Sequence, residues 1–370
     1  MMNTMRHIRK TRMNIKVELI YLIFILTLNL SCAENKKSDK ETDNSEFVRF
    51  SENDTLKFTS GIRAIFQDSK GNYWFGSHNE GVSVYDGKLF KYITTNDGLP
   101  NNQIRTIQED DNGIIWIVTV SGVCSYDRLK ITNYPTEIGN PKLDWNSTKG
   151  NLWFYAGEED GINRFDGKEM YYLIFPKPKN INPNNSFGVT GISQDKNGKL
   201  WIATYSALFS YDGKKVDIYE EKKLNLKNDE LIHIRSVLAD SKGRIWIGNN
   251  GIGVILIKGE TLTHFSKEQG RLIPMDKFIY NTQNNQTEKN TGIQSVFAIE
   301  EDSEGNIWFG DRDSGVWKFD GKTLTNYSID KSLSTQMTWS IYKDNRDNLL
   351  FGMADGGVYQ FNGKTFEKRF

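Results

Sequence analysis

A nine-residue motif that recurs seven times limits what this chain can fold into more than any other feature of its sequence. The clearest copies begin with Asp, carry Gly three positions later and carry Trp three positions after the Gly. They read "DSKGNYWFG" from Asp68, "DDNGIIWIV" from Asp110, "DKNGKLWIA" from Asp195, "DSKGRIWIG" from Asp240 and "DSEGNIWFG" from Asp302. Imperfect copies, "STKGNLWFY" and "DNRDNLLFG", begin at Ser147 and Asp344. The chain is therefore expected to repeat one structural unit.

The spacing and content of the copies define that unit. The six motif tryptophans and the leucine that takes their place in the last copy lie 42, 37, 48, 45, 62 and 42 residues apart. A period near 45 residues is that of a propeller blade. The first unit contains the short β-branched and aromatic runs "IRAIFQD", "NYWFGS", "VSVYDG" and "LFKYIT", separated by Gly and Asp turns. We therefore predict an all-β fold, a seven-bladed β-propeller whose blades each hold four antiparallel strands, a to d.

Each motif residue has a structural interpretation. Asp suits the first position of the turn between strands a and b, where its carboxylate accepts backbone N–H groups, and Gly suits the left-handed residue that closes the turn. "YDGK" from Tyr85 and its relatives are two-residue hairpin signals between strands c and d. Trp on strand b would be buried between neighbouring blades. A catalytic or calcium-binding role for the repeated Asp residues is the alternative.

Two segments compete to complete the last blade. "EFVRF" from Glu46 and "KTFEKRF" at the C-terminus both resemble strand d, which gives eight such segments for seven blades. The sequence leaves open which of them closes the ring.

The N-terminus is typical of an exported lipoprotein. Five basic residues precede the apolar run "LIYLIFILTL", which is short for a membrane span and is typical of a secretion signal at residues 1–31. Cys32 follows a small residue and resembles the acylated cysteine of bacterial lipoproteins. Residues 32–45 are polar and predict a flexible tether, so that the propeller comprises residues 46–370. We expect an outer-membrane lipoprotein of the cell envelope that contacts the membrane only through its lipid; an uncleaved anchor or ordinary cleavage nearby is the alternative.

Charge and cysteine content exclude several classes of function. Loss of residues 1–31 removes five of 47 basic and one of 47 acidic residues, which leaves 42 against 46 and gives no support for nucleic-acid binding. Cys124 is the only cysteine besides Cys32, so no intramolecular disulfide is expected. His78, His233 and His264 remain, and no two stand at metal-ligand spacing. No cofactor or metal is therefore expected.

The segment "GLPNNQIRTIQEDDNGIIWI" from Gly98, with "YDGK" and the "LFKYIT" strand, resembles the two-component regulator propeller repeats in periplasmic sensor regions of bacterial hybrid histidine kinases. The resemblance covers residues 46–370. Kinases of this family place such propellers before an immunoglobulin-like module, a membrane helix and kinase domains. The chain ends at Phe370 without these modules, which favours a stand-alone lipoprotein that works with an envelope sensor kinase or transporter.

The predicted functional site lies at one mouth of the central channel. The a–b and c–d turns share one face of the propeller (the turn face) and hardly vary in length, whereas the b–c and d–a loops share the other (the loop face) and vary widely. One column of residues, five positions before the motif Asp, falls at the loop end of each innermost strand: Arg63, Arg105, Lys142, Thr190, Arg235, Phe297 and Trp339. Residues of the b–c loops, His78, Tyr205 and Arg312, are expected to add contacts.

Four cations and two aromatic rings at a channel mouth favour an anionic ligand. Arginine forks suit carboxylate, sulfate or phosphate, and aromatic faces suit sugar rings. The alternative is that the cations pair with carboxylates of adjacent loops, namely Glu80, Glu158, Glu159, Asp160, Asp311 and Asp313.

These features favour a non-catalytic ligand-binding or sensor propeller that takes a small molecule, an anionic glycan fragment or a partner protein. A second hypothesis is a lyase or hydrolase acting on a glycan or lactone-type substrate. Propellers of the streptogramin-lyase type are similar in overall build and use a histidine and acidic residues with a metal, and His78 beside Glu80 is the pair that could serve here. A third hypothesis is an interaction platform for another envelope protein.

Overall fold

The computed structural model describes residues 51–143, 145, 150–177, 185–227, 230–273 and 292–370, which belong to one compact unit, Phe47–Phe370. The predicted signal, Cys32, the tether and the strand candidate at residues 46–50 lie outside the described residues. None of the helices in these ranges is long and apolar enough to cross a membrane.

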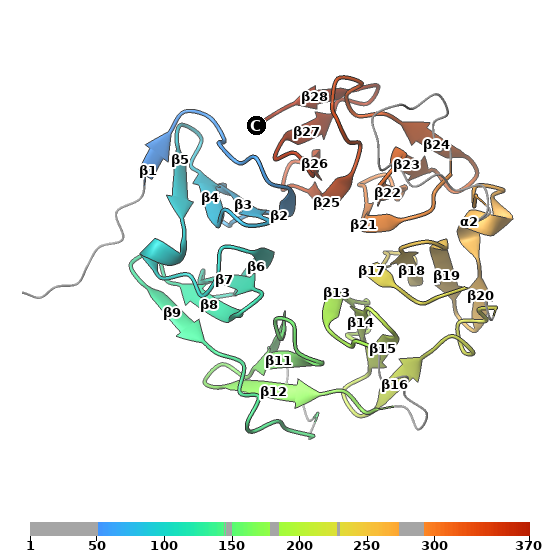
Figure 1. Ribbon diagram of the computed structural model, residues 1–370, viewed down its shortest axis with the longest axis horizontal. Coiled ribbons are helices and arrows are strands. Elements are labelled where there is room, and N and C mark those ends of the chain that lie inside the picture. The colour runs from blue at the N-terminus through green and yellow to red at the C-terminus, as the bar shows by residue number, and fades with distance from the viewer. Residues whose placement is uncertain (1–50, 144, 146–149, 178–184, 228–229, 274–291) are drawn as a thin grey trace, which may run out of the picture. The chain divides into compact units, whose positions relative to one another are not determined.

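Seven antiparallel sheets stand around a central axis, so the predicted seven-bladed β-propeller is confirmed (Figure 1). Blades one to three hold β1 (Ser51–Asn53), β2 (Ile62–Gln67), β3 (Tyr73–Ser77), β4 (Val82–Tyr85) and β5 (Phe90–Ile93); β6 (Ile104–Glu109), β7 (Ile115–Thr119), β8 (Gly122–Tyr126) and β9 (Ile131–Tyr134); and β10 (Leu152–Tyr155), β11 (Gly161–Phe165) and β12 (Met170–Ile174). Blades four and five hold β13 (Val189–Gln194), β14 (Leu200–Thr204), β15 (Leu208–Tyr211) and β16 (Val216–Tyr219); and β17 (Ile234–Ala239), β18 (Arg244–Asn249), β19 (Gly253–Lys258) and β20 (Thr261–Thr263). Blades six and seven hold β21 (Val296–Glu301), β22 (Ile307–Asp311), β23 (Gly315–Phe319) and β24 (Leu324–Tyr327); and β25 (Thr338–Lys343), β26 (Leu349–Met353), β27 (Val358–Phe361) and β28 (Phe366–Lys368).

Two blades depart from four strands. Blade one has a fifth strand, because β1 pairs outside β5, and blade three has three strands among the residues that the structure describes. In the connections that the structure describes, there are one 3-10 turn, η1 (Thr95–Asp97), and one short helix, α2 (Phe265–Glu268).

Among the described residues, the C-terminal candidate completes the last blade, because β28 pairs with β27. β1, which directly follows the N-terminal candidate, pairs with β5 in blade one. Contacts between blades seven and one then close the circle: Ser340 Oγ donates to the carbonyl of Ile62 at 2.9 Å, and Tyr73 Oη donates to Asp344 Oδ2 at 2.6 Å. The ring of the C-terminal residue Phe370 lies 5.0 Å from that of Phe75 in blade one.

The motif Asp does more than start the turn. Asp240 Oδ1 accepts the backbone N–H groups of Lys242 and Arg244, and Oδ2 accepts the indole N–H of Trp246 at 2.8 Å. The same indole bond forms at Asp68, Asp110, Asp195 and Asp302. The Gly of the turn is left-handed, as Gly243 with a φ of 75° shows. One carboxylate therefore joins the turn to the buried indole on strand b.

The indole in turn packs on the next blade. Trp246 is fully buried, and its ring lies 5.5 Å from Phe309 and 6.0 Å from Phe319, both of blade six. The predicted placement of the motif tryptophan between blades is confirmed for this residue, and Trp74, Trp116 and Trp308 are buried in the same way.

Candidate functional site

A β-bulge turns the same residue toward the channel in six blades. In blade one the register of β2 against β3 shifts between Ile62 and Ala64, which leaves Arg63 unpaired between them. Because the bulged residue is released from the ladder, its side chain can be re-aimed. Equivalent shifts enclose Arg105, Thr190, Arg235, Phe297 and Trp339. The bulge thus provides the column that the alignment of repeats predicted.

These six residues line one cavity of about 220 Å³. Tyr205 of the b–c loop in blade four and Tyr155 at the end of β10 complete the wall. The next residues of the same strands also line the cavity and include small ones, such as Ser236, Ala298 and Ser340. Side chains from six different blades and two tyrosines therefore meet at the loop end of the channel.

Lys142 does not join this group, and its predicted position was wrong. Its backbone N–H donates to the carbonyl of Tyr172 at 2.8 Å, which places it beside β12 at the outside of blade three, and its Nζ donates to Asn140 Oδ1 at 2.7 Å. The physical reason is the nearby indole of Trp145. This buried indole donates to the carbonyl of Ile174 at 3.1 Å and so holds the segment against β12. Tyr155 occupies the place at the cavity that Lys142 was expected to take.

The three arginines of the cavity, Arg63, Arg105 and Arg235, form what we call the three-arginine cluster. Within the described part of the chain, none of the ion pairs includes any of them. The Nε atoms of Arg63 and Arg105 are buried without a hydrogen-bond partner. Burial, together with repulsion from Arg105 and Arg235, lowers the pKa of Arg63 to about 9.

Three of the six carboxylates proposed as partners accept hydrogen bonds from backbone groups of the loops. Glu80 accepts the backbone N–H groups of Thr59 and Ser60, and Asp160 accepts that of Phe187. Asp311 is fully buried and accepts backbone N–H groups of both adjoining loops, including those of Ser295 and Ser314. The alternative of structural ion pairs is therefore not supported for the three-arginine cluster.

Aromatic rings stack against the guanidinium groups of two of the arginines. The guanidinium of Arg63 lies 3.8 Å from the centre of the Trp339 ring, and that of Arg235 lies 4.3 Å from Phe297 and 5.3 Å from Tyr205. Cation–π attraction of this kind offsets part of the cost of holding the cations together. It also fixes the direction of each guanidinium.

A histidine stands beside each of these stacks. The ring of His78 lies 5.1 Å from Trp339, and that of His233 lies 5.4 Å from Tyr205. Burial first, and neighbouring arginines second, lower the pKa of both histidines. His78 does not pair with Glu80, whose oxygens take the N–H and hydroxyl groups of Thr59 and Ser60.

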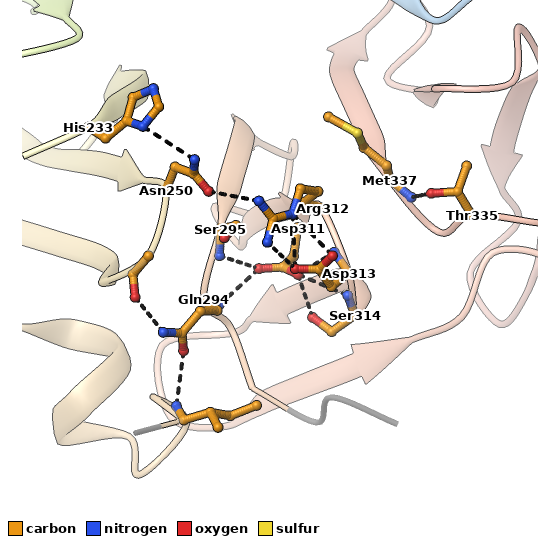
Figure 2. Close-up of polar contacts among 12 residues, drawn as sticks. His233, Asn250, Gln294, Ser295, Asp311, Arg312, Asp313, Ser314, Thr335 and Met337 are labelled. Carbon is orange, nitrogen blue, oxygen red and sulfur yellow. Dashed lines mark hydrogen bonds and ion pairs between the residues drawn. The ribbon is translucent and has the colours of Figure 1, made fainter. Parts of the chain in front are cut away.

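Arg312 lies outside the cavity wall and has protein partners. Figure 2 shows its guanidinium between Asp313 and Asn250, with Nη2 to Asp313 Oδ2 at 2.8 Å and Nη1 to Asn250 Oδ1 at 3.3 Å. Asn250 Nδ2 continues to His233 Nδ1 at 3.3 Å. The sequence analysis considered Asp311 only as an ion-pair partner, but its carboxylate joins the b–c and d–a loops of this region through hydrogen bonds. Burial raises the pKa of Asp311, although the backbone N–H groups that donate to it act in the opposite direction. Among the described residues, no group of three or more His, Cys, Asp or Glu side chains could hold a metal ion.

The family match falls on the best copies of the repeat. The model of the two-component regulator propeller family matches residues 57–79, 98–121, 183–206, 230–251 and 292–313, which belong to blades one, two, four, five and six. The chain carries two-component regulator propeller repeats. The two blades without a match, three and seven, are those with the imperfect motifs.

Solved structures share the fold of this chain. The extracellular domain of a hybrid two component system from B. thetaiotaomicron has a TM-score of 0.61 at 19% identity, over 84% of this chain and 40% of that one. A second such domain from that organism has a TM-score of 0.58 at 20% identity, over 84% and 39%. Virginiamycin B lyase from Staphylococcus aureus has a TM-score of 0.60 at 14% identity, over 84% and 98%. The chain thus spans about two fifths of the sensor domains, and no curated protein sequence matches it.

Proposed function

We propose that this protein is a non-catalytic ligand-binding propeller of the bacterial cell envelope, which acts as a sensor or capture module. Its ligand is a small anionic molecule or glycan fragment, which binds at the mouth of the channel on the loop face. The observation that carries this proposal is the three-arginine cluster, which has no carboxylate partner among the described residues. Buried polar and charged groups without partners are costly in a folded protein. An anionic ligand would supply the missing acceptors.

Two further points support the proposed location. The repeat family is that of two-component regulators, and two of the similar structures are extracellular domains of such systems. The signal-like N-terminus and Cys32 are consistent with export and lipid anchoring. In this proposal the propeller presents its loop face to the ligand and acts through an envelope sensor kinase or transporter.

Titration calorimetry with a panel of anionic glycan fragments and metabolites tests the proposal. R63A and R105A should each weaken binding about tenfold or more, because a charge-assisted hydrogen bond contributes about 1.5–3 kcal/mol. The matched control is R346A, since Arg346 is exposed on the turn face and its backbone N–H, which alanine keeps, makes its bond to Asp344. Equal affinity of all three variants and the wild type would contradict the proposal.

A lyase is the second candidate, because the fold similarity extends over 98% of virginiamycin B lyase and two histidines stand at the same mouth. The same panel distinguishes the two functions when product formation is followed by mass spectrometry. A binding module leaves every ligand unchanged. Turnover that is lost in H78A or H233A would replace the proposal with an enzyme.

An interaction platform for another envelope protein remains as the third function. In that case no compound of the panel would bind, and R63A and R105A would give the same calorimetric result as R346A. Co-purification of an envelope partner with all four proteins would then favour the platform.

A further inference from the structure

Resting on the proposed function, we infer that the group recognised by the three-arginine cluster is a tetrahedral oxyanion, the sulfate or phosphate of a monoester. One such group would bind near the channel axis, with each arginine donating to a different oxygen. The inference depends on the directions of the three arginines, on their charge and on the surfaces that remain free on them.

The three arginines approach the axis from different directions. Arg63 and Arg105 come from β2 and β6 in adjacent blades, and Arg235 comes from β17, which lies across the central opening from both (Figure 1). All three line the same cavity. A sulfate or phosphate monoester presents three terminal oxygens in three directions, whereas a carboxylate presents two oxygens in one plane. Three donors spread around an axis therefore match the tetrahedral group better.

The charge of the site favours the same group. Arg105 and Arg235 both act on Arg63 as repelling charges, so the three cations are close enough to interact. None of the ion pairs found in the described ranges neutralises them. A phosphate monoester brings a charge of about −1.5 to −2 near neutral pH. A sulfate monoester and a monocarboxylate each bring a charge of about −1, so the charge favours phosphate in particular, and only the number and directions of the oxygens separate sulfate from a carboxylate.

The aromatic rings leave N–H groups of Arg63 and Arg105 without a partner, whereas Arg235 also has a side-chain hydrogen bond with Tyr205. Trp339 covers one face of Arg63, while Phe297 and Tyr205 flank Arg235. A guanidinium stacked in this way can still donate from its edge, which is where a bidentate bond to an oxyanion forms. The unpartnered Nε atoms of Arg63 and Arg105 belong to such edges.

Three ligands that share a phenyl ring isolate the contribution of the anionic group. Calorimetry would compare phenyl phosphate, phenyl sulfate and benzoate on the full chain. We expect one-to-one binding of phenyl phosphate or phenyl sulfate at least about tenfold tighter than benzoate. The ratio between the first two identifies which ester the site prefers.

Variants of each arginine test whether each arginine binds a different oxygen of the ligand. R63Q, R105Q and R235Q should each weaken the preferred ester about tenfold, and R63K should weaken it as well, because lysine keeps the charge without the fork. R346Q should leave all affinities unchanged. Thermal melting of each variant checks that it is folded. The Nε–H resonances of Arg63 and Arg105 should shift when the preferred ester is added.

The outcomes separate this inference from the proposed function. If benzoate binds as tightly as the two esters, or if a carboxylate ligand from the anion panel binds while neither ester does, the tetrahedral group is wrong and the proposed anion site stands. If substitution of one arginine has no effect on ester binding while the other two are needed, the three-way division is wrong. If no anion binds and the arginine variants behave as R346Q does, both proposals fail.

Discussion

The turns of the turn face and the channel mouth differ in whether their buried charged groups have hydrogen-bond partners. On the turn face, Asp240 is almost fully buried and accepts hydrogen bonds from backbone N–H groups, an indole and the Nε of Arg244. At the mouth on the loop face, Arg63 and Arg105 have buried Nε atoms with no acceptor. Removing a partner from a buried charge whose hydrogen bonds are complete is strongly destabilising, whereas a buried charge without partners already lowers stability and marks a candidate functional site.

The largest effect that sharpens this comparison should come from the turn-face indole. W246A should lower the free energy of unfolding by about 3–5 kcal/mol, because it leaves a cavity between blades five and six. Chemical denaturation measures this loss. L129A is the control, since Leu129 is a large side chain that is 65% exposed in a c–d turn, and we expect a change below about 0.5 kcal/mol. Equal losses in the two variants would show that the indole does not join the blades.

Removing the carboxylate beneath the indole should have the next largest effect. D240A leaves the buried indole N–H of Trp246 and the turn N–H groups without an acceptor, which should cost about 2–3 kcal/mol in the free energy of unfolding. D212A removes two similar turn bonds from an exposed c–d hairpin and should lower the free energy of unfolding clearly less than D240A does. A loss at Asp212 as large as that at Asp240 would contradict the special role of the indole bond.

The sequence predicts the turn face better than the mouth, for a physical reason. Asp, Gly and Trp act within nine consecutive residues, so the local pattern contains the turn and its hydrogen bonds. In the imperfect seventh copy Leu350 cannot donate, and the hydroxyl of Tyr73 from blade one donates to Asp344 Oδ2 instead. That contact joins residues 271 positions apart, which no local pattern specifies.

The mouth depends on features that alignment of the repeats only partly reveals. The column was found correctly in six blades, but the bulges that aim it were not foreseen, and Lys142 was misplaced. One feature of the sequence could have corrected the predicted position of the inner strand in blade three. Two residues after the motif Trp, six copies carry small residues or Val: Gly76, Val118, Ala203, Gly248, Gly310 and Gly352. A Cβ on Gly248 would meet Ser236 Oγ and the carbonyl of Val296, so the inner strands leave no room there. Tyr155 in this column therefore agrees with blade three, where the described residues form no inner strand in that place.

Removing a charge at the mouth should raise the free energy of unfolding, whereas removing one on the turn face should lower it. R63Q should raise the free energy of unfolding, by up to about 1 kcal/mol at pH 7, because it relieves burial and repulsion. Since the folded-state pKa of about 9 lies below the ordinary value of 12.5, the cost is present below pH 9 and is relieved as the pH rises through that value. The difference between R63Q and the wild type in denaturation should therefore shrink above pH 9. A less stable R63Q at pH 7 would contradict the comparison.

A smaller effect concerns the turn itself in blade seven. Asp347 takes the place of the motif Gly and has a φ of 63°, so D347G should raise the free energy of unfolding by about 0.5–1 kcal/mol. G243D is the reverse change at a left-handed turn position that has space for a side chain, and it should lower stability by a similar amount. If both variants lose stability, a contact of the Asp347 side chain outweighs the backbone strain.

The smallest expected effect is a pH dependence of binding at the mouth. His78 is packed against Trp339 and Gln103 near Arg63 and Arg105, and His233 is packed against Tyr205 and Asn250 near Arg235 and Arg312. Burial and these arginines lower the pKa of both histidines in the free protein. A bound anion offsets the repulsion and raises the pKa, so binding is accompanied by proton uptake and strengthens as the pH falls through the window just below 6.5.

Inorganic sulfate is the probe for this effect because it does not titrate in that range. Its affinity should be about threefold higher at pH 5.5 than at pH 7.5, and the difference should disappear in H78N/H233N. H264N should keep the full pH dependence, since His264 contacts the carbonyl of Asn225 and does not line the cavity. Weaker binding at the lower pH would mean that the histidines do not sense the anion, and would place the bound charge away from the two stacks that flank the axis.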